Sequence, residues 1–274
     1  MSGSAGFVGK HLTKQLLEDG HAVISLSREE NSIEDLMSLC QKEKFDGIIH
    51  LASLFLAQHK SEDIKGMIDS NILLGTNLLE AATKNNVPWF INTGTFWQHY
   101  EDKEYSPVNL YSATKQAFED IARYYIETSE INFVTVKLID TFGPNDTRPK
   151  LFNLWTKISR SGEALDMSAG EQIIDISFID NVVDGYVRMI ELLSKDVDKK
   201  LNGKSFAVTS GERMSLRELA ALFEKTTGKK LNINWGKRPY RPREVMMPWQ
   251  TGETIPGWTP KISIEEGIRK TFNI

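Results

Sequence analysis

The sequence has a single cysteine, no apolar run of membrane-spanning length and no cluster of basic residues. Cys40 cannot form an internal disulfide, and no secretory signal is recognisable, so a reducing, cytoplasmic location is expected. The 274 residues include 33 Lys and Arg against 37 Asp and Glu, which gives a net charge of −4. This balance disfavours nucleic acid and membranes as partners. No histidine has metal-ligand spacing around it, so no metal site is expected.

The sequence also lacks a strand in front of its glycine-rich start, "MSGSAGFVGKHL". Gly3, Gly6 and Gly9 stand three apart and run into an amphipathic helical stretch. Glycines in such a turn let the backbone approach a pyrophosphate at the helix N-terminus. The loop normally follows the central strand of the sheet, yet only Met1 and Ser2 precede it. We hypothesise that the chain is a fragment or starts at an internal methionine, which N-terminal sequencing of the natural protein would test.

Apolar strand-like runs alternate with amphipathic helical stretches along the first half of the chain. The predicted strands are residues 21–27, 46–53, 89–95 and 133–139, and the predicted helices between them are 32–44, 71–86 and 111–129. This alternation predicts an α/β fold with a doubly wound parallel sheet covered on both faces. Beyond about residue 144 the pattern becomes irregular. The predicted domains are a dinucleotide-binding Rossmann domain, 1–145 with 173–210 contributing, and a smaller substrate-binding lobe, 146–172 with 211–274.

The predicted strand 21–27 ends in Ser27 and Arg28, about twenty residues past the glycine loop. An acidic residue at this place would bind the ribose hydroxyls of NAD, whereas a hydroxyl followed by a guanidinium suits a 2′-phosphate. NADPH is therefore favoured over NAD. The alternative is that Arg28 is a solvated surface charge.

Tyr111 and Lys115 in "NLYSATKQAF" are four residues apart and so lie on one face of a helix. A neighbouring ammonium and the positive charge of a nicotinamide ring would favour the phenolate of the tyrosine. The alternative is a half-buried tyrosine beside a solvated lysine. Shortly before this helix, "FINTGT" ends a strand in hydroxyl residues, and a threonine there could hydrogen-bond a substrate oxygen.

Six stretches in this order, "GSAGFVG", "HLAS", "NILLGTNLLEAA", "FINTGT", "YSATK" and "KLIDTFGP", resemble the extended short-chain dehydrogenase/reductases. This is the NAD-dependent epimerase/dehydratase family of nucleotide-sugar enzymes, and the resemblance covers nearly the whole chain. By position, the family's Ser/Thr falls on Thr93, with Thr95 a second candidate. The resemblance implies that Tyr111 exchanges a proton with the sugar oxygen. It also implies that Lys115 holds the nicotinamide ribose and lowers the pKa of the tyrosine.

The expected cofactor site combines the glycine loop, the ends of the next two strands and the catalytic helix. Its residues are Gly3, Gly6, Phe7, Val8, Ser27, Arg28, Leu51, Ala52, Ser53, Tyr111 and Lys115. For the stretch containing Leu51 to Ser53, a place in the core is the alternative.

The dehydratases of the family carry an acidic pair directly after the catalytic threonine, where this chain has Gly94 and Thr95. A dehydratase is therefore disfavoured. The stretch from residue 92 to 121 is most similar to reductases of CDP-4-keto-3,6-dideoxyhexoses, which consume NADPH in O-antigen synthesis. A C4-epimerase is the alternative, because the same Thr, Tyr and Lys serve both reactions. A catalytically silent NADP(H)-binding scaffold is a third reading, but such proteins commonly lose the tyrosine or the lysine.

The resemblance implies a nucleotide sugar, expected to be CDP-linked, as the small-molecule partner. Arg241 best matches the family's diphosphate-binding arginine, whereas a second arginine, usual before Asp175, is replaced by Ile174. The expected substrate-binding residues are Thr95, Asp140, Asn145, Lys150, Phe152 and Arg241. For the loop residues the alternative is an ordinary loop with Phe152 in the core.

Three further expectations concern packing and association. Trp249 is expected to pack within the small lobe, and His99 to lie on a loop surface. The family resemblance also implies a homodimer formed through the helices predicted at 71–86 and around Tyr111.

Overall fold

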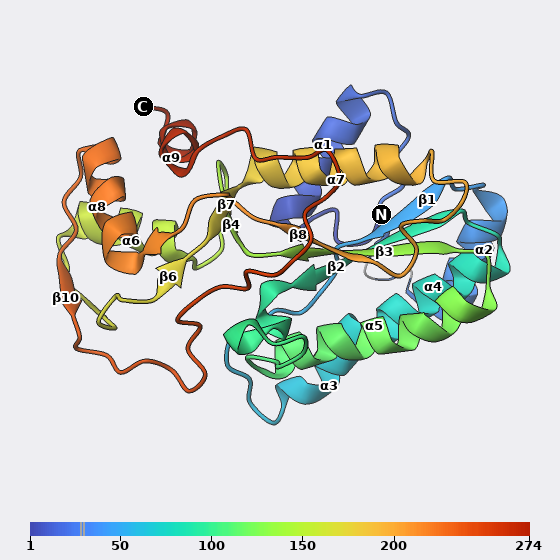
Figure 1. Ribbon diagram of the computed structural model, residues 1–274, viewed down its shortest axis with the longest axis horizontal. Coiled ribbons are helices and arrows are strands. Elements are labelled where there is room, and N and C mark those ends of the chain that lie inside the picture. Colours follow the sequence, from blue (N-terminus) through green and yellow to red (C-terminus); the bar gives the residue numbers. More distant parts are fainter. Residues whose placement is uncertain (28, 30) are drawn as a thin grey trace.

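The computed structural model describes residues 1–27, 29 and 31–274, and its centre is a parallel sheet between two layers of helices (Figure 1). The strands lie in the order β1 (Gly47–His50), β2 (Trp89–Thr95), β3 (Asn132–Leu138) and β8 (Ser205–Val208). Every neighbouring pair in this sheet is parallel. The predicted doubly wound α/β fold is confirmed.

Helices cover both faces of the sheet. Figure 1 shows α1 (Phe7–Glu18) and α7 (Ile179–Leu193) above it, and α2 (Ile33–Lys42), α4 (Leu74–Lys84) and α5 (Leu110–Thr128) below. Side chains alternate along β2, so Trp89 and Ile91 join the core beneath α1 and α7, while Phe90 joins the other. Both faces are therefore apolar, as a parallel sheet requires. Within the described residues, no helix is both long and apolar enough to cross a membrane.

The prediction of a strand at 21–27 is wrong for a physical reason. The place beside β1 is taken by Met1 and Ser2: the Ser2 amide donates to the Ile49 carbonyl at 3.0 Å, and Ser2 bridges His50 in parallel. On the other side, the Leu26 amide donates to the Met1 carbonyl at 2.9 Å. A two-residue neighbour cannot supply the repeated hydrogen bonds of a ladder, so residues 21–27 form no regular strand.

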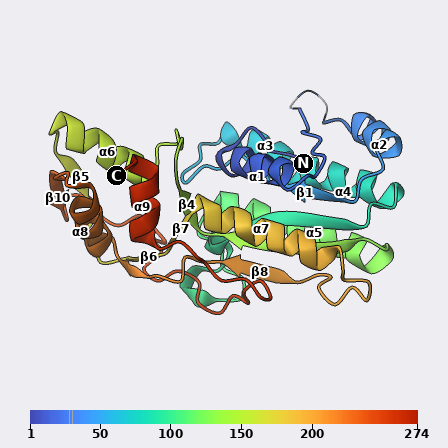
Figure 2. The ribbon, with the colours of Figure 1, turned by 90° about the horizontal axis from the view of Figure 1, so that it is seen from above.

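A smaller lobe lies at one end of the sheet (Figure 2). It contains α6 (Leu151–Ser161), β5 (Leu165–Met167), β6 (Ile173–Ile174), β9 (Met214–Ser215), α8 (Leu216–Thr227), β10 (Ile233–Trp235) and α9 (Ile264–Phe272). Two short strands, β4 (Asp140–Phe142) and β7 (Ile176–Phe178), pair in parallel at the junction. Aromatic rings from Phe142, Phe152 and Phe223 pack together behind them, so one core extends from the sheet into the lobe.

Residues 236–256, which we call the strap, return from the lobe to the sheet without regular secondary structure of any length. The strap leaves the lobe where the Gly236 amide donates to Ser168 and reaches the sheet where the Ala207 amide donates to Glu253 at 2.7 Å. In Figure 1 it is the long orange-red segment that passes below β6 toward β8. The strap contacts the segment that forms two short helices after β2, η2 (Phe96–Gln98) and η3 (Tyr100–Asp102).

Between β1 and α4, the chain forms α3 (Asp63–Ile68) and a π-helical turn, η1 (Asp69–Leu73), both of which contact α5.

The glycine loop closes tightly on itself and on the end of β1. Gly3 adopts φ +74°, and the Gly6 amide donates to the Gly3 carbonyl at 3.0 Å. A Cβ on Gly9 would lie 2.1 Å from the same carbonyl oxygen. The loop geometry therefore requires glycine at positions 3 and 9.

Gly9→Ala is expected to lower the free energy of unfolding by about 1–3 kcal/mol, because the loop must move to make room for the methyl group. Gly66→Ala is the matched control, since its Cβ would meet only Leu54 Cδ2 at 3.4 Å in an exposed helix. The control should be neutral or slightly stabilising, because alanine favours helix. Urea unfolding measures both, and equal stability of the two variants would contradict this packing.

Candidate active site

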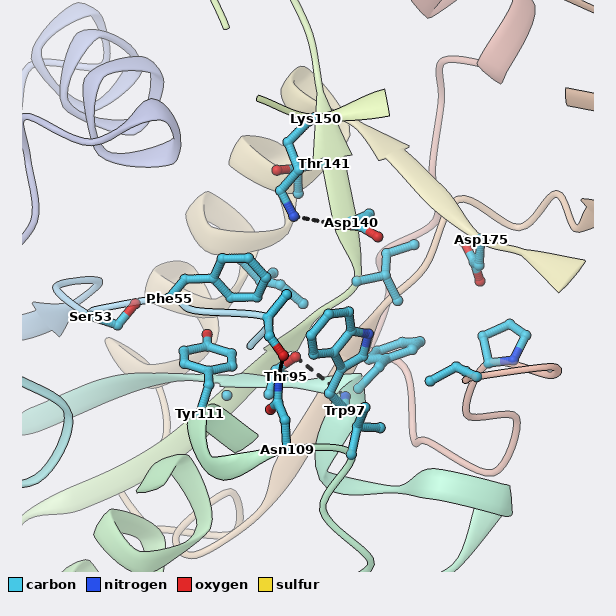
Figure 3. A pocket seen from close by; sticks show the side chains of 18 of the residues that line it. Ser53, Phe55, Thr95, Trp97, Asn109, Tyr111, Asp140, Thr141, Lys150 and Asp175 are labelled. Atoms are coloured by element: carbon cyan, nitrogen blue, oxygen red, sulfur yellow. Dashed lines mark hydrogen bonds and ion pairs between the residues drawn. The ribbon is translucent and has the colours of Figure 1, made fainter. Parts of the chain in front are cut away.

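A cavity of about 840 Å³ opens where β1, β2 and β3 end, between the sheet and the lobe. Its lining comes from the glycine loop, the three strand ends, the start of α5 and the strap. The carboxyl ends of parallel strands are the usual place for ligands in such a sheet. Figure 3 shows side chains from these distant segments pointing into one space.

The glycine loop forms one wall of the cavity. Gly3, Gly6, Phe7 and Val8 line it at the N-terminus of α1, together with Leu51 and Ser53 after β1. Ala52 is not among the lining residues; its backbone packs against the loop, since a Cβ on Gly3 would lie 2.6 Å from the Ala52 amide nitrogen. A loop without side-chain bulk at a helix N-terminus fits the pyrophosphate of a dinucleotide.

Of the two residues expected to bind the adenosine ribose, the structure describes one. Ser27 is exposed at the end of segment 21–27, and Arg28 lies outside the described residues. The preference for NADPH stays a prediction.

Helix α5 brings Tyr111 to the cavity wall and carries Lys115 one turn further along, buried behind it. Its N-cap is Asn109, whose side chain accepts from the Ser112 amide at 3.0 Å and donates to the Ala57 carbonyl at 3.1 Å. The cap both starts the helix and ties it to the loop after β1. Tyr111 is 9% exposed and Lys115 only 1%.

The ammonium of Lys115 is buried, and within the described residues its Nζ has no hydrogen-bond partner. Burial lowers the pKa of Lys115 to about 8, against a weaker opposing effect of Glu119. A buried cation without partners is costly unless a ligand completes its hydrogen bonds. The residues present therefore fit the nicotinamide ribose that the family resemblance places here.

The pKa of Tyr111 is raised to about 12, first by burial and then by the charge of Asp140, while a hydrogen bond with Ser53 lowers it. The lowering of this pKa by Lys115 is expected in the cofactor-bound site and stays a prediction. The cost of burying a phenolate outweighs the contacts that favour it. Tyr111 is a neutral phenol at neutral pH.

The two candidate threonines of β2 differ in their contacts. Thr93 Oγ1 is hydrogen-bonded to the hydroxyl of Tyr186 from α7, at 2.6 Å. Thr95 Oγ1 accepts from the Trp97 amide at 3.3 Å, and among the described residues no acceptor takes its own proton. Both residues line the cavity, and Figure 3 shows Thr95 close to Tyr111 and Trp97.

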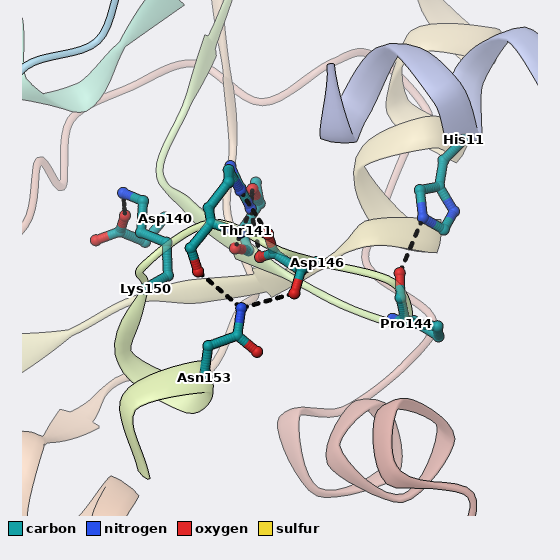
Figure 4. A network of polar contacts seen from close by, with 8 residues as sticks. His11, Asp140, Thr141, Pro144, Asp146, Lys150 and Asn153 are labelled. Atoms are coloured by element: carbon teal, nitrogen blue, oxygen red, sulfur yellow. Dashed lines mark hydrogen bonds and ion pairs between the residues drawn. The ribbon is translucent and has the colours of Figure 1, made fainter. Parts of the chain in front are cut away.

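Of the other predicted substrate residues, Asp140, Lys150 and Arg241 line the cavity. Lys150 Nζ lies 2.8 Å from Asp140 Oδ1, as Figures 3 and 4 show. The side edge of the Arg241 guanidinium, Nε and Nη2, pairs with both carboxylate oxygens of Glu244 at 3.0 Å.

The structure corrects two predicted substrate residues, Asn145 and Phe152. Asn145 is exposed at φ +61° in a loop that Asp146, Arg148 and Asn153 close on itself (Figure 4). Phe152 is 4% exposed and packs edge-on against Phe142, with the ring centres 4.7 Å apart. Neither lines the cavity. For Phe152 the reason is that the first residue of an amphipathic helix face enters the core as readily as a site.

Four aromatic residues of the cavity were not predicted as site residues: Phe55, Phe96, Trp97 and Trp249. The ring of Phe55 meets Tyr111 edge-on at 5.0 Å and lies 5.5 Å from the ring of Trp97. Trp249, expected inside the small lobe, instead lines the cavity and stacks on His99. An apolar run after a strand and a tryptophan in an irregular segment give no signal that distinguishes site from core.

A glycine loop at a helix N-terminus and a buried Tyr–Lys pair beneath strand-end hydroxyls together define a Rossmann-type, nicotinamide-dependent dehydrogenase/reductase site. The chain belongs to the NAD dependent epimerase/dehydratase family, whose model matches residues 1–202. It is therefore a nicotinamide-dependent enzyme of a family that acts on nucleotide sugars.

Characterised relatives with full-length similarity carry out different reactions. The chain is 26% identical to the CDP-abequose synthase of Salmonella muenchen, over 100% of this chain and 96% of that protein. It is 24% identical to the UDP-glucose 4-epimerase of Pisum sativum, over 100% and 94%.

Solved structures share the fold. A UDP-glucose 4-epimerase of Thermotoga maritima has a TM-score of 0.84 at 21% identity, over 99% of this chain and 96% of that one. A UDP-glucuronic acid 4-epimerase of Bacillus cereus, in complex with UDP-glucuronic acid and NAD, has a TM-score of 0.82 at 22% identity and the same coverage.

Lys115→Met is expected to stabilise the cofactor-free protein at pH 7 by up to about 3 kcal/mol, because lowering the pKa from 10.5 to about 8 measures the cost of the buried charge. Between pH 8 and 10.5 the native lysine is neutral while the unfolded one still binds a proton. The stability of the wild type therefore rises with pH, and its difference from the variant shrinks.

Urea unfolding at pH 7 and pH 9.5 tests this expectation. Lys14→Met, at a lysine whose side chain is 75% exposed, is the control and should change little at either pH. A stability difference for Lys115→Met that does not depend on pH would contradict the buried ammonium.

Proposed function

We propose that the protein reduces the 4-keto group of a nucleotide-linked deoxyhexose with NADPH, as a CDP-abequose/paratose synthase-like enzyme of O-antigen or lipopolysaccharide sugar synthesis. The observation that carries the proposal is geometric: Tyr111 and Thr95 both line the cavity, no described acceptor takes the hydroxyl proton of Thr95, and no acidic pair follows either threonine. A neutral phenol is the form that a ketone reduction requires, since it must give up a proton.

The bound nicotinamide would supply a hydride to the carbonyl carbon. Tyr111 would donate its hydroxyl proton to the carbonyl oxygen as that oxygen gains negative charge, and the product is an alcohol. Thr95 would donate a hydrogen bond to the same oxygen and hold the carbonyl in line with Tyr111. Lys115 would hold the cofactor ribose and stabilise the phenolate left on Tyr111, which then regains a proton from solvent.

The absence of an acidic pair argues against a dehydratase. Thr93 is followed by Gly94 and Thr95, and Thr95 is followed by Phe96 and Trp97. Loss of water needs one group to remove a proton from carbon and another to protonate the leaving hydroxyl. Neither threonine is followed by a carboxylate that could do this.

The strap and the lobe would bind the nucleotide sugar. Glu244 holds one edge of the Arg241 guanidinium, which leaves the outer edge for a diphosphate oxygen. Lys150 and Asp140 stand at the cavity wall, where they could reach sugar hydroxyls. Similarity to CDP-abequose synthases over the full length supports a CDP-linked sugar. The lobe made of 146–172 and 211–274 stays a prediction.

A C4-epimerase using NAD is the second candidate. It is supported by full-length similarity to UDP-glucose 4-epimerase and by the shared Tyr–Lys pair. An epimerase must first take a proton from a sugar hydroxyl, which requires the Tyr111 phenolate; in the cofactor-free protein, burial disfavours this form. A silent scaffold would have no use for a buried lysine that finds no hydrogen-bond partner among the described residues. We also infer a cytoplasmic homodimer through α4 and α5, as the family resemblance implies.

Incubation with an enzymatically made CDP-4-keto-3,6-dideoxyhexose is expected to consume NADPH stoichiometrically, and NADH more slowly, as followed by absorbance. Tyr111→Phe should lower kcat by at least ~10²-fold, because no other group donates the proton. Thr95→Val should cost about 10²-fold, and Thr93→Val less, since Thr93 already bonds Tyr186.

The epimerase predicts a different outcome. Without added cofactor, no net oxidation would occur, and the NMR spectrum of an offered UDP- or CDP-hexose would change at C4. That result would show that the protein is an epimerase and not a reductase.

A further inference from the structure

A buried network of charged and polar side chains lies behind the cavity, where the sequence suggested a loop surface. His99 is 6% exposed and Lys137, on β3, is 4% exposed, so the expectation of an exposed His99 is wrong. Gln98 is fully buried, and Glu119 on α5 is mostly buried. The proposed chemistry uses none of the four.

Lys137 stands at the centre of the network. Its Nζ lies 2.9 Å from His99 Nε2 and 3.4 Å from Glu119 Oε2. His99 Nδ1 lies 3.1 Å from the Lys103 carbonyl oxygen and must donate to it, so Nε2 accepts from the ammonium. Burial and the charge of Lys137 lower the pKa of His99 to about 4, which agrees with a neutral ring.

One end of the network reaches the backbone of Thr95. The side-chain oxygen of Gln98 accepts from the Thr95 amide at 2.9 Å. The side-chain nitrogen of Gln98 donates to Glu119 at 2.9 Å and to Gln116 at 2.8 Å. The end of β2 is thereby tied to α5, the helix that carries Tyr111.

The other end reaches the strap. The His99 ring lies flat on Trp249, with ring centres 3.9 Å apart and planes 9° apart, and Phe96 meets the same indole edge-on at 5.3 Å. Trp249 lines the cavity eight residues after Arg241. Arg213 Nη2, from the lobe, also donates to the Trp249 carbonyl at 2.8 Å.

Stability alone does not account for such a network. Removing two charges from water costs more than a buried ion pair commonly returns, and apolar side chains of similar size would serve a core as well. What the charges provide is a fixed direction for the His99 ring, because Nε2 must face Lys137 and Nδ1 must face Lys103. The face of that ring is the surface on which Trp249 rests.

We propose that Gln98, His99, Glu119 and Lys137 are positioning residues that hold the strap across the cavity in register with Thr95 and so set the affinity for the nucleotide sugar. The nature of the ligand rests on the proposed function, whereas the docking of the strap does not. Loss of the network loosens Trp249 and, with it, Arg241.

The test uses Lys137→Met with Glu119→Gln, which removes both charges together, and His99→Leu, which removes the stacked ring. KM for the CDP-4-keto-sugar is expected to rise about tenfold in both variants. A change of this size lies within the range of coupling free energies measured between residues of one hydrogen-bond network. In His99→Leu, which leaves Glu119 and its effect on Lys115 in place, the kcat value and the affinity for NADPH should stay within about twofold. The loss of substrate affinity should not be matched by a proportional fall in the midpoint of thermal unfolding. The control is His21→Leu, at an exposed histidine outside the site.

A second readout needs no substrate. In protein labelled with 5-fluorotryptophan, the fluorine resonance absent from Trp249→Phe belongs to Trp249, and it should move in both network variants but not in His21→Leu. A moved resonance with an unchanged KM would overturn the positioning role. A fall in kcat and in NADPH affinity that accompanies the rise in KM would overturn it as well. If the wild type turns over no nucleotide sugar, the proposed function fails, while an unmoved resonance would independently refute the docking.

Discussion

The site depends on one constraint, a buried ammonium that has no hydrogen-bond partner in the part of the chain that the structure describes. Lys115 cannot reach water because α5 is fixed at its start by the Asn109 cap and along its length by Phe118 in the core. The cost, about 3 kcal/mol of folding free energy, is paid by the packing of the rest of the sheet. A group that offers oxygen atoms to this ammonium recovers that free energy on binding, so the site is preformed for such a group.

The second half of the site comes from a different part of the chain. The strap leaves the lobe, passes the cavity and returns to β8, and it carries Arg241 and Trp249 on the way. Because it lacks regular secondary structure, side chains rather than a ladder must hold it. Asp102 accepts from the Gln250 amide, Arg243 donates to Ser106, and His99 stacks on Trp249. The segment after β2 thus links the part of the cavity that holds Tyr111 and Thr95 to the strap, which carries Arg241.

The sheet, its covering helices and the Tyr111–Lys115 pair could be predicted because each leaves a local periodic signal. Strands buried on both faces are continuously apolar, and a spacing of four brings two side chains to one helix face. The strand at 21–27 could not be judged locally, since a strand exists only through its neighbour, and that neighbour is two residues long.

The surroundings of Phe152, His99, Trp249 and Phe55 were not predicted from the sequence, and all four failures have one cause. Whether an aromatic ring faces a core or a cavity depends on segments far away in the chain. For His99 those segments are β3 and the strap, which no spacing around residue 99 reveals. The neutral state of Tyr111 was likewise hidden, because burial and not its sequence neighbour sets the pKa.

The buried ammonium is tested most directly by the pKa of Lys115 itself, followed by NMR of the lysine side chains labelled with ¹³C and ¹⁵N, with Lys115→Met for assignment. We expect a value near 8 in the cofactor-free protein and a rise when NADPH binds, since hydrogen bonds to the charged form favour it. A lysine that titrates near its ordinary value of about 10.4, or a pKa that NADPH leaves unchanged, would show that the ammonium is not held as described.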